Sequence, residues 1–269
     1  LFFIVKVYLM REDIKKADII VIKVGTSLLV SPETGIIESA ISKLASVLAQ
    51  LIRSGKKIIL VSSGAVGAGT VQLGEVSKYA AAAVGQGILT GLYEAEFKKH
   101  DQKIGQLLLS RDILTVPENR QAFDQTIQEL LARRILPIVN ENDAVTVDEG
   151  EHRTKFEDND ELSLLIAEAV GADLLIMLTD VNGLYSENPT INEEAQMIRH
   201  LSKIDQRLFE ASDPSLGKLS RGGIRSKLKT ATGALTANIS MVLANGRDPH
   251  VLYDILAGRE IGTLFKKQQ

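Results

Sequence analysis

The sequence has no cysteine, no tryptophan and only four histidines among its 269 residues. Without cysteine, disulfide bonds and thiolate zinc sites are excluded, and four scattered histidines argue against a His-rich metal centre. A metal ion would instead be expected to be Mg²⁺, held by carboxylates and a phosphorylated ligand. Aromatic residues make up only 4% of the chain, so platforms on which nucleic-acid bases could stack are poorly supplied.

The sequence also lacks an excess of positive charge, because 31 basic and 34 acidic residues give a net charge of −3. This balance argues against a nucleic-acid partner and against a polybasic membrane surface. The apolar stretch Leu1–Met10 is shorter than the roughly 20 residues that a membrane span needs, and no small-residue cleavage site follows it. We therefore expect a cytoplasmic protein, with residues 1–18 as an N-terminal extension and Met10 as a possible natural start.

Apolar runs of β-branched residues alternate with amphipathic helical patterns along the chain, and no linker, repeat or heptad interrupts them. This alternation predicts an α/β fold, a three-layer αβα sandwich around a central, mostly parallel sheet. We expect one domain with two lobes, from residue 19 to about 173 and from about 174 to 269. The predicted strands are Ile19–Val24, Lys57–Val61, Ile104–Leu109, Ile135–Val139, Leu174–Leu178, Met197–Leu201, Ser240–Ala244 and Gly262–Phe265.

The stretch from Val139 to Asp160 concentrates acids and amides directly after a predicted strand. Open α/β sheets bind their ligands at such strand ends. By itself the stretch is equally compatible with a solvated surface loop.

A glycine-rich loop, Ser62–Gly69, follows the second predicted strand. Its glycine spacing is not that of a dinucleotide fold, no phosphate-binding P-loop motif occurs, and His152-Arg153 is not followed by the aspartate of a protein-kinase loop. Backbone N–H groups at the start of the next helix could bind an anion. Tight turn packing is the other interpretation of these glycines.

Three further features suit phosphoryl transfer when they are taken together. Lys23 ends a buried strand, Gly222-Gly223 leads into a helix that carries Lys227, and Thr179-Asp180 ends another strand. Phosphoryl transfer needs positive charge on the transferring group and parts that align donor and acceptor. Taken alone, the segment after Gly222-Gly223 is better explained as a solvated basic helix face, and Asp180 could equally be a capping residue.

Several short motifs make the chain resemble the amino acid kinase family from about Ile19 to Phe265. They occur in the order of that family, and those around Asn140 and Gly262 are specific to its glutamate-phosphorylating branch. The matching segments are Val21–Ser27, Val61–Ala65, Ala83–Gln86, Asn140–Val145, Asp158–Asp160, Thr179–Asp180 with Gly183–Tyr185, and Gly262–Phe265.

The resemblance implies ATP-dependent phosphorylation of the γ-carboxylate of L-glutamate to γ-glutamyl phosphate, the first step of proline biosynthesis, with Mg²⁺ bridging the nucleotide phosphates. We assign no metal ligand to a residue of the protein itself. Glutamate would lie on the first lobe and ATP on the second, in a homo-oligomer (dimer or tetramer) that proline could inhibit. Many members of the family carry a C-terminal PUA domain, which we do not expect in residues 19–269.

The resemblance also implies a role for individual residues. Lys23 and Lys227 would stabilise the transferring group, and Asp160 would hold both lysines. Glutamate would be bound by Ser63, Asn140, Asp143 and Asn159, with Asp143 at its α-ammonium. Lys23 and Lys227 would also contact the nucleotide, together with Thr179, Asp180, Gly222 and Gly223, while Gly25 and Gly64 would let the backbone approach the phosphoryl group.

The chain departs from the family pattern in three places: the nucleotide flap Ser220–Ile224, Glu157 where glycine is usual, and a longer loop from Thr146 to Glu157. Two alternatives to glutamate phosphorylation stay open. One is a related kinase that acts on N-acetylglutamate, and the other is a non-catalytic module that senses proline or a nucleotide. Asp143 favours an unacylated substrate, and the retained Lys23, Asp160 and Lys227 favour catalysis.

Overall fold

The computed structural model describes residues 11–146, 155–187, 189, 192–211 and 223–267. A sheet of eight strands forms its centre, in the order β5-β6-β4-β1-β7-β9-β10-β8. All pairings are parallel except that of β9 with β10. The strands are β1 Ile19–Val24, β4 Lys57–Ser62, β5 Ile104–Leu109, β6 Leu136–Glu141, β7 Leu174–Thr179, β8 His200–Leu201, β9 Ser240–Asn245 and β10 Thr263–Phe265.

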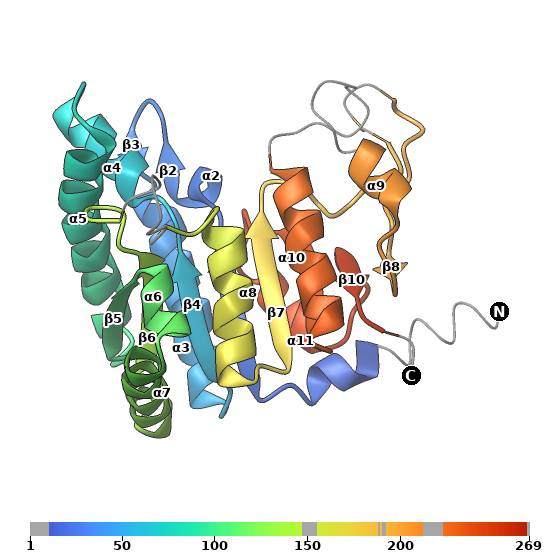
Figure 1. Cartoon of the computed structure of the whole chain (residues 1–269), viewed down its shortest axis with the longest axis horizontal. Coiled ribbons are helices and arrows are strands. Elements are labelled where there is room, and N and C mark those ends of the chain that lie inside the picture. Colours follow the sequence, from blue (N-terminus) through green and yellow to red (C-terminus); the bar gives the residue numbers. More distant parts are fainter. Residues whose placement is uncertain (1–10, 147–154, 188, 190–191, 212–222, 268–269) are drawn as a thin grey trace.

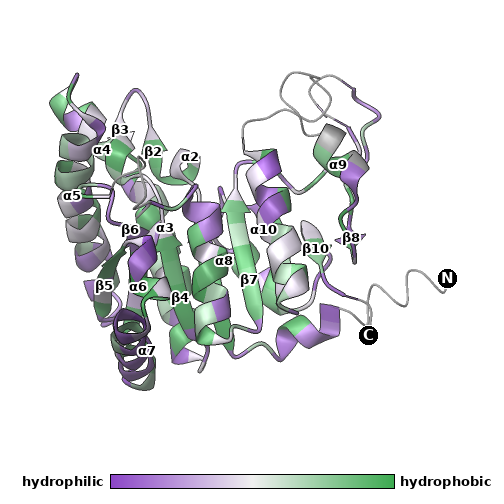
Figure 2. Cartoon of the chain, viewed as in Figure 1, coloured by the Kyte–Doolittle hydropathy of each residue, from purple (hydrophilic) through white to green (hydrophobic). Residues whose placement is uncertain are grey.

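Helices cover both faces of this sheet, which confirms the predicted αβα sandwich (Figure 1). Helices α3 (Glu38–Arg53), α5 (Lys78–Lys98) and α11 (Val251–Leu256) pack on one face. Helices α7 (Pro117–Ala132), α8 (Asn159–Val170) and α10 (Ile224–Thr236) pack on the other. Figure 2 shows the hydrophobic residues concentrated along β4 and β7 and the hydrophilic ones over the outer helix α7.

The alternation of side chains along β1 decides which residue reaches which layer. Ile20, Ile22 and Val24 belong to the core beneath α3 and α5, whereas Val21 belongs to the core beneath α8 and α10. Because side chains alternate along a strand, Lys23 lies on the same face as Val21. The lysine at the end of the strand is therefore directed toward α8.

Several short elements were not predicted. They are a helix at residues 11–15, helix α2 (Thr26–Leu29), the hairpin β2–β3 (Val30–Ser31 and Gly35–Ile36), helix α4 (Ala65–Leu73), and helix α6 (Arg111–Thr115). The predicted strand Met197–Leu201 was too long, since only His200–Leu201 joins the sheet and Met197 forms an isolated bridge with Tyr185. Helix α9 spans Gln206–Ala211.

Helices α4 and α5 pack unusually closely, because glycines lie between them. A Cβ added at Gly69 would lie 1.8 Å from the carbonyl oxygen of Ala81, and one at Gly85 would lie 1.8 Å from that of Ala65. Two further glycines of α5, Gly87 and Gly91, do not contribute to this contact, since a Cβ at either position would meet nothing within 4 Å.

The segment that precedes β1 is fastened to the far end of the sheet. Arg11 is 1% exposed, and its guanidinium donates hydrogen bonds to the carbonyls of Arg199, Arg259, Ile261 and Gly262 at 2.8–3.3 Å. Ile14 and Ala17 are buried beside it. Among the described helices, none is long and apolar enough to cross a membrane.

Candidate active site

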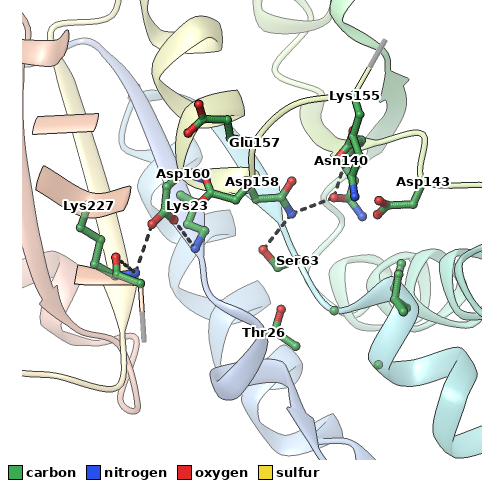
Figure 3. A pocket seen from close by; sticks show the side chains of 17 residues that line it. Lys23, Thr26, Ser63, Asn140, Asp143, Lys155, Glu157, Asp158, Asp160 and Lys227 are labelled. Carbon is green, nitrogen blue, oxygen red and sulfur yellow. Dashed lines mark hydrogen bonds and ion pairs between the residues drawn. The ribbon is translucent and has the colours of Figure 1, made fainter. Parts of the chain in front are cut away.

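A cavity of about 410 Å³ lies at the carboxyl ends of β1, β4 and β6, where it is closed by the first turns of α8 and α10 (Figure 3). The carboxyl ends of parallel strands share one edge of the sheet, so side chains that are far apart in sequence meet there. The predicted residues Lys23, Ser63, Gly64, Asn140, Asp143, Asn159, Asp160, Gly223 and Lys227 all line this cavity.

Asp160 bridges two lysines at the centre of the cavity. Its Oδ1 lies 2.6 Å from the Nζ of Lys23, and its Oδ2 accepts a hydrogen bond from the Nζ of Lys227 at 3.1 Å. Burial would by itself raise the pKa of Asp160, but the charges and hydrogen bonds of the two lysines outweigh it, so the net pKa is lowered. The carboxylate is therefore ionised at neutral pH, and it fixes two ammonium groups side by side.

The sequence around Asp160 explains how it is held in place. Asp158 caps α8, because its Oδ1 accepts the backbone N–H groups of Asp160 and Glu161 at 3.0 Å. The hydroxyl of Ser226, in the first turn of α10, donates to Asp158 Oδ2. The starts of α8 and α10 are thereby joined next to the lysine pair. Asp158 was not predicted as a site residue, although a capping residue three positions before Glu161 is a recognisable signal.

A chain of amide hydrogen bonds forms the second half of the cavity. The Nδ2 of Asn159 donates to Ser63 Oγ at 2.8 Å and to Asn140 Oδ1 at 3.0 Å. The Nδ2 of Asn140 donates to Gln86 Oε1 at 2.8 Å. Since these bonds occupy the donors of Asn159, its carbonyl oxygen is left as an acceptor for a ligand. Gln86 had been identified only as part of a motif, and its position beside Asn140 depends on how α5 packs.

Asp143 lies after β6, between the main cavity and a smaller one of about 250 Å³. It is half-buried. Burial raises its pKa, and the positive charges of Lys155 and Lys78 counteract part of that rise. In the described part of the chain its carboxylate has no hydrogen-bond or ion-pair partner, so it is available to a cationic group of a ligand.

Glu141, which sequence reasoning did not select, supports the same region. It is 5% exposed, and its Oε1 accepts the backbone N–H of Phe156 at 3.0 Å. Arg111 stacks over the ring of Phe156 at 5.5 Å and forms a two-point hydrogen bond with Glu161, at 2.7 Å for each oxygen. The segment that returns to α8 is thus held between β6 and α6.

The two glycines predicted to approach the phosphoryl group differ in conformation. Gly64 has φ = 105° and precedes α4, so a side chain there would be strained. Ala65, Val66 and Gly67 of the first turn of α4 line the cavity, where the unpaired N–H groups of a helix start can bind an anion. Gly25 has an ordinary φ of −72°. The expected glycine-rich loop is correspondingly shorter, because α4 begins at Ala65 and both Gly67 and Gly69 are helical.

The predicted nucleotide residues are only partly brought to the cavity. Gly223, with φ = 93°, begins α10 and lines the cavity, while Gly222 and the flap residues before it lie outside the described residues. Thr179 and Asp180 end the neighbouring strand β7 beyond the cavity lining. There the Thr179 hydroxyl donates to Asp180 Oδ1 at 3.1 Å, and the Asn245 amide donates to the Asp180 carbonyl at 3.3 Å. Asn245 is a further residue that the sequence did not single out.

Two other sequence predictions fall on segments that are not described. Residues 1–10 of the expected N-terminal extension are one, and residues 147–154 of the loop from Thr146 to Glu157 are the other. Glu157 itself is described, and its carboxylate forms an ion pair with Lys229 on α10 at 2.6 Å.

The chain is similar to known proteins over most of its length. The model of the amino acid kinase family matches residues 18–245. A glutamate 5-kinase of Enterococcus faecalis is 43% identical over 265 residues, which cover 96% of this chain and 98% of that protein. A glutamate 5-kinase of Lactiplantibacillus plantarum is 45% identical over 257 residues, which cover 93% and 97% respectively.

Solved structures with the same fold are more distant in sequence. The carbamate kinase from Giardia lamblia bound to AMP-PNP superposes with a TM-score of 0.65 at 15% identity, covering 94% of this chain and 99% of that one. The isopentenyl phosphate kinase of T. acidophilum gives a TM-score of 0.64 at 16% identity, covering 92% and 100%. The chain belongs to the amino acid kinase family, on the branch of the glutamate 5-kinases.

Proposed function

We propose that this protein transfers the γ-phosphoryl group of ATP to the side-chain carboxylate of L-glutamate, which forms γ-glutamyl phosphate and ADP. The observation that carries the proposal is the single cavity in which Asp160 holds Lys23 and Lys227 next to an amide cluster and the free carboxylate of Asp143. The lysine pair suits a phosphoryl group in transfer, and the amide cluster with Asp143 suits an amino acid. The reaction would be the first step of proline biosynthesis.

The chemistry needs no general base, because a glutamate side chain with an ordinary pKa of about 4.3 is already ionised at neutral pH. One of its oxygens attacks the γ-phosphorus, and the bond from that phosphorus to the ADP oxygen breaks. Charge spread over the phosphoryl oxygens in the transition state must be stabilised. The ammonium groups of Lys23 and Lys227 supply this stabilisation, and Asp160 keeps them in position before the substrates bind.

Glutamate would be bound between the amide chain and Asp143. Ser63, Asn140 and Asn159 are fixed relative to one another by hydrogen bonds of 2.8–3.0 Å, so their remaining polar groups are preorganised. Asp143 would take the α-ammonium. An N-acetylated substrate would leave that half-buried carboxylate without a cation, which disfavours N-acetylglutamate.

The nucleotide would lie over the second lobe, near Thr179, Asp180, Gly222 and Gly223. Asp160 uses both of its oxygens for lysines, and no group of three or more acids or histidines among the described residues could hold a metal. Mg²⁺ would therefore be bound mainly by the phosphates of ATP, whose charge it neutralises. The proposed location is the cytoplasm, where ATP is available.

We also propose self-association into a dimer or tetramer. Tyr79 and Val84 of α5 are about 40% exposed (40% and 38%), which supports a contact through that helix. Light scattering would give the mass in solution and hence the oligomeric state. Inhibition by proline is proposed on the same basis as the substrate, and adding proline to the assay below tests it.

The test is phosphorylation in the presence of hydroxylamine, which converts γ-glutamyl phosphate to a stable hydroxamate. Hydroxamate should form with ATP and L-glutamate, and not when N-acetylglutamate replaces glutamate. ADP should appear in proportion to hydroxamate and should require glutamate. ADP formation that is independent of glutamate, or hydroxamate formed better from N-acetylglutamate, would refute the proposal.

A further inference from the structure

Lys155 is a positively charged residue of the main cavity, and the reaction described above assigns it no role. It lines the cavity together with Asn140 and Asp143. Its backbone is held on both sides, because Arg111 Nε donates to the Lys155 carbonyl at 3.3 Å and the next residue, Phe156, donates its N–H to Glu141. In Figure 3 the Lys155 side chain runs from the loop toward Asn140 and Asp143. The fold therefore delivers this ammonium group to the amino-acid end of the cavity.

Lys155 and Asp143 are opposite charges that approach each other without pairing. Within the described residues, neither the ammonium of Lys155 nor the carboxylate of Asp143 has an ion-pair or hydrogen-bond partner. They are nonetheless close enough for the charge of Lys155 to lower the pKa of Asp143 against the effect of burial. Half-buried charges without partners are costly, and a ligand that carries both charges would satisfy the two residues together.

The other lysines near Asp143 are less well placed to contact a ligand beside it. Lys23 and Lys227 are engaged by Asp160 at the opposite end of the cavity. Lys78 also acts on Asp143 through its charge, but it is exposed, its ammonium lies over the ring of Tyr79 at 5.1 Å, and it does not line the cavity. Lys155 is thus the cation placed to act on a ligand beside Asp143.

We infer that Lys155 binds the α-carboxylate of the substrate while Asp143 binds its α-ammonium, an assignment that rests on the proposed function. The two residues together recognise the zwitterionic end of an α-amino acid. The substrate class is thereby restricted to amino acids with both α-groups free and a carboxylate in the side chain. Amines, diacids and N-acylated acids lack one of the two charges.

The test compares the binding of glutamate and of 4-aminobutyrate to the wild type and to Lys155→Gln. 4-Aminobutyrate is glutamate without the α-carboxylate, so it retains the ammonium group and the carboxylate to be phosphorylated. In Lys155→Gln the KM for glutamate should rise about 10- to 100-fold, the loss expected for one hydrogen bond to a charged group. The affinity for 4-aminobutyrate, measured as a substrate or as a competitive inhibitor, should change less than about twofold, since it has no group for Lys155 to contact.

Lys78→Gln is the matched control, because it removes a lysine that acts on Asp143 from outside the cavity. It should leave the KM for both ligands near that of the wild type. The kcat of Lys155→Gln at saturating glutamate and its KM for ATP should also stay within about twofold, whereas a distorted site would change both. Lys155→Arg should recover part of the affinity for glutamate because it restores the charge.

An equal loss of affinity for both ligands in Lys155→Gln, or no loss for either, would overturn the role of Lys155. Either result, in an enzyme that still phosphorylates glutamate, leaves the proposed function intact. A wild-type enzyme that does not phosphorylate glutamate would instead overturn the proposed function itself.

Discussion

Replacing Asp160 by asparagine removes the charge that holds the two catalytic lysines and leaves the shape of the side chain almost unchanged. The carboxylate lies 2.6 Å from Lys23 Nζ and 3.1 Å from Lys227 Nζ. At an effective dielectric constant of about 20, each contact corresponds to about 5–6 kcal/mol of attraction before desolvation is subtracted. Removing one member of a buried ion pair costs about 3–5 kcal/mol in net stability, because the partner charge stays buried.

Asp160→Asn should therefore unfold at a temperature about 10 °C lower than the wild type. At 25 °C its kcat should fall about 10²- to 10³-fold, because the lysines repel each other and no longer meet the phosphoryl group in a fixed geometry. The KM for glutamate should change by less than about threefold, since Asp160 is outside the amide chain that binds the amino acid. Steady-state kinetics and thermal unfolding of the same preparations measure these quantities.

Asp124→Asn is a matched control on the outer surface of α7. It breaks an ion pair of similar length, 2.8 Å to Arg120, but both partners are about one-third exposed (34% and 36%). Such a pair contributes about 0–1 kcal/mol, so stability and kcat should stay close to the wild type. A kcat of Asp160→Asn within about threefold of the wild type would refute the reasoning.

The difference in stability between the wild type and Asp160→Asn should depend on pH in a direction set by the lowered pKa of Asp160. The pKa of Asp160 in the folded protein is lower than its ordinary value of 3.8. The stability that the carboxylate contributes is therefore fully present above the unfolded pKa, and it is lost as the pH falls through the lowered pKa. The difference in stability between wild type and Asp160→Asn should be constant from pH 6 to 8 and should narrow only in acid.

Four further substitutions test other parts of the account. Asp143→Asn should raise the KM for glutamate about 10- to 100-fold. Since burial raises the Asp143 pKa, the same substitution should stabilise the fold at neutral pH and lose this effect as the pH falls through the raised pKa, as thermal unfolding would show. Gly85→Ala should lower the unfolding temperature because its Cβ would meet the Ala65 carbonyl, whereas Gly87→Ala should be neutral or stabilising; equal effects would contradict the close helix packing. Arg11→Met should destabilise the fold by about 1–3 kcal/mol in denaturant unfolding, because it leaves buried carbonyls without a donor.

Much of the sheet could be predicted because its central strands are buried on both faces. Strands such as Ile19–Val24 and Leu174–Thr179 appear as continuous apolar runs bounded by turns. The short elements were missed for the opposite reason. Hairpin β2–β3 has two residues in each strand. The buried residues of α4 are only Ala65, Ala68 and Gly69, so the helix lacks the stripe of large apolar side chains that a helix ordinarily shows.

The chemistry of the site was partly visible in the sequence because Lys23 and the acid and amide residues follow predicted strands. The contacts that orient them were not visible. Gln86 reaches Asn140 across 54 positions, and Ser226 reaches Asp158 across 68. Those pairs depend on how helices α5 and α10 pack on the sheet, which no local pattern specifies. Lys155 was overlooked because it is an isolated lysine in a polar loop, and only its position in the cavity gives it a role.

The central claim is that a carboxylate oxygen of glutamate attacks the γ-phosphorus of ATP in the cavity around Asp160. Glutamate labelled with ¹⁸O in its side-chain carboxylate tests this directly when hydroxylamine is present. Attack by that oxygen places it between carbon and phosphorus, and hydroxylamine then displaces phosphate at the carbon. Mass spectrometry should find one ¹⁸O atom in each phosphate released by the wild type. Phosphate without ¹⁸O would mean that water, not glutamate, receives the phosphoryl group, and it would contradict the account.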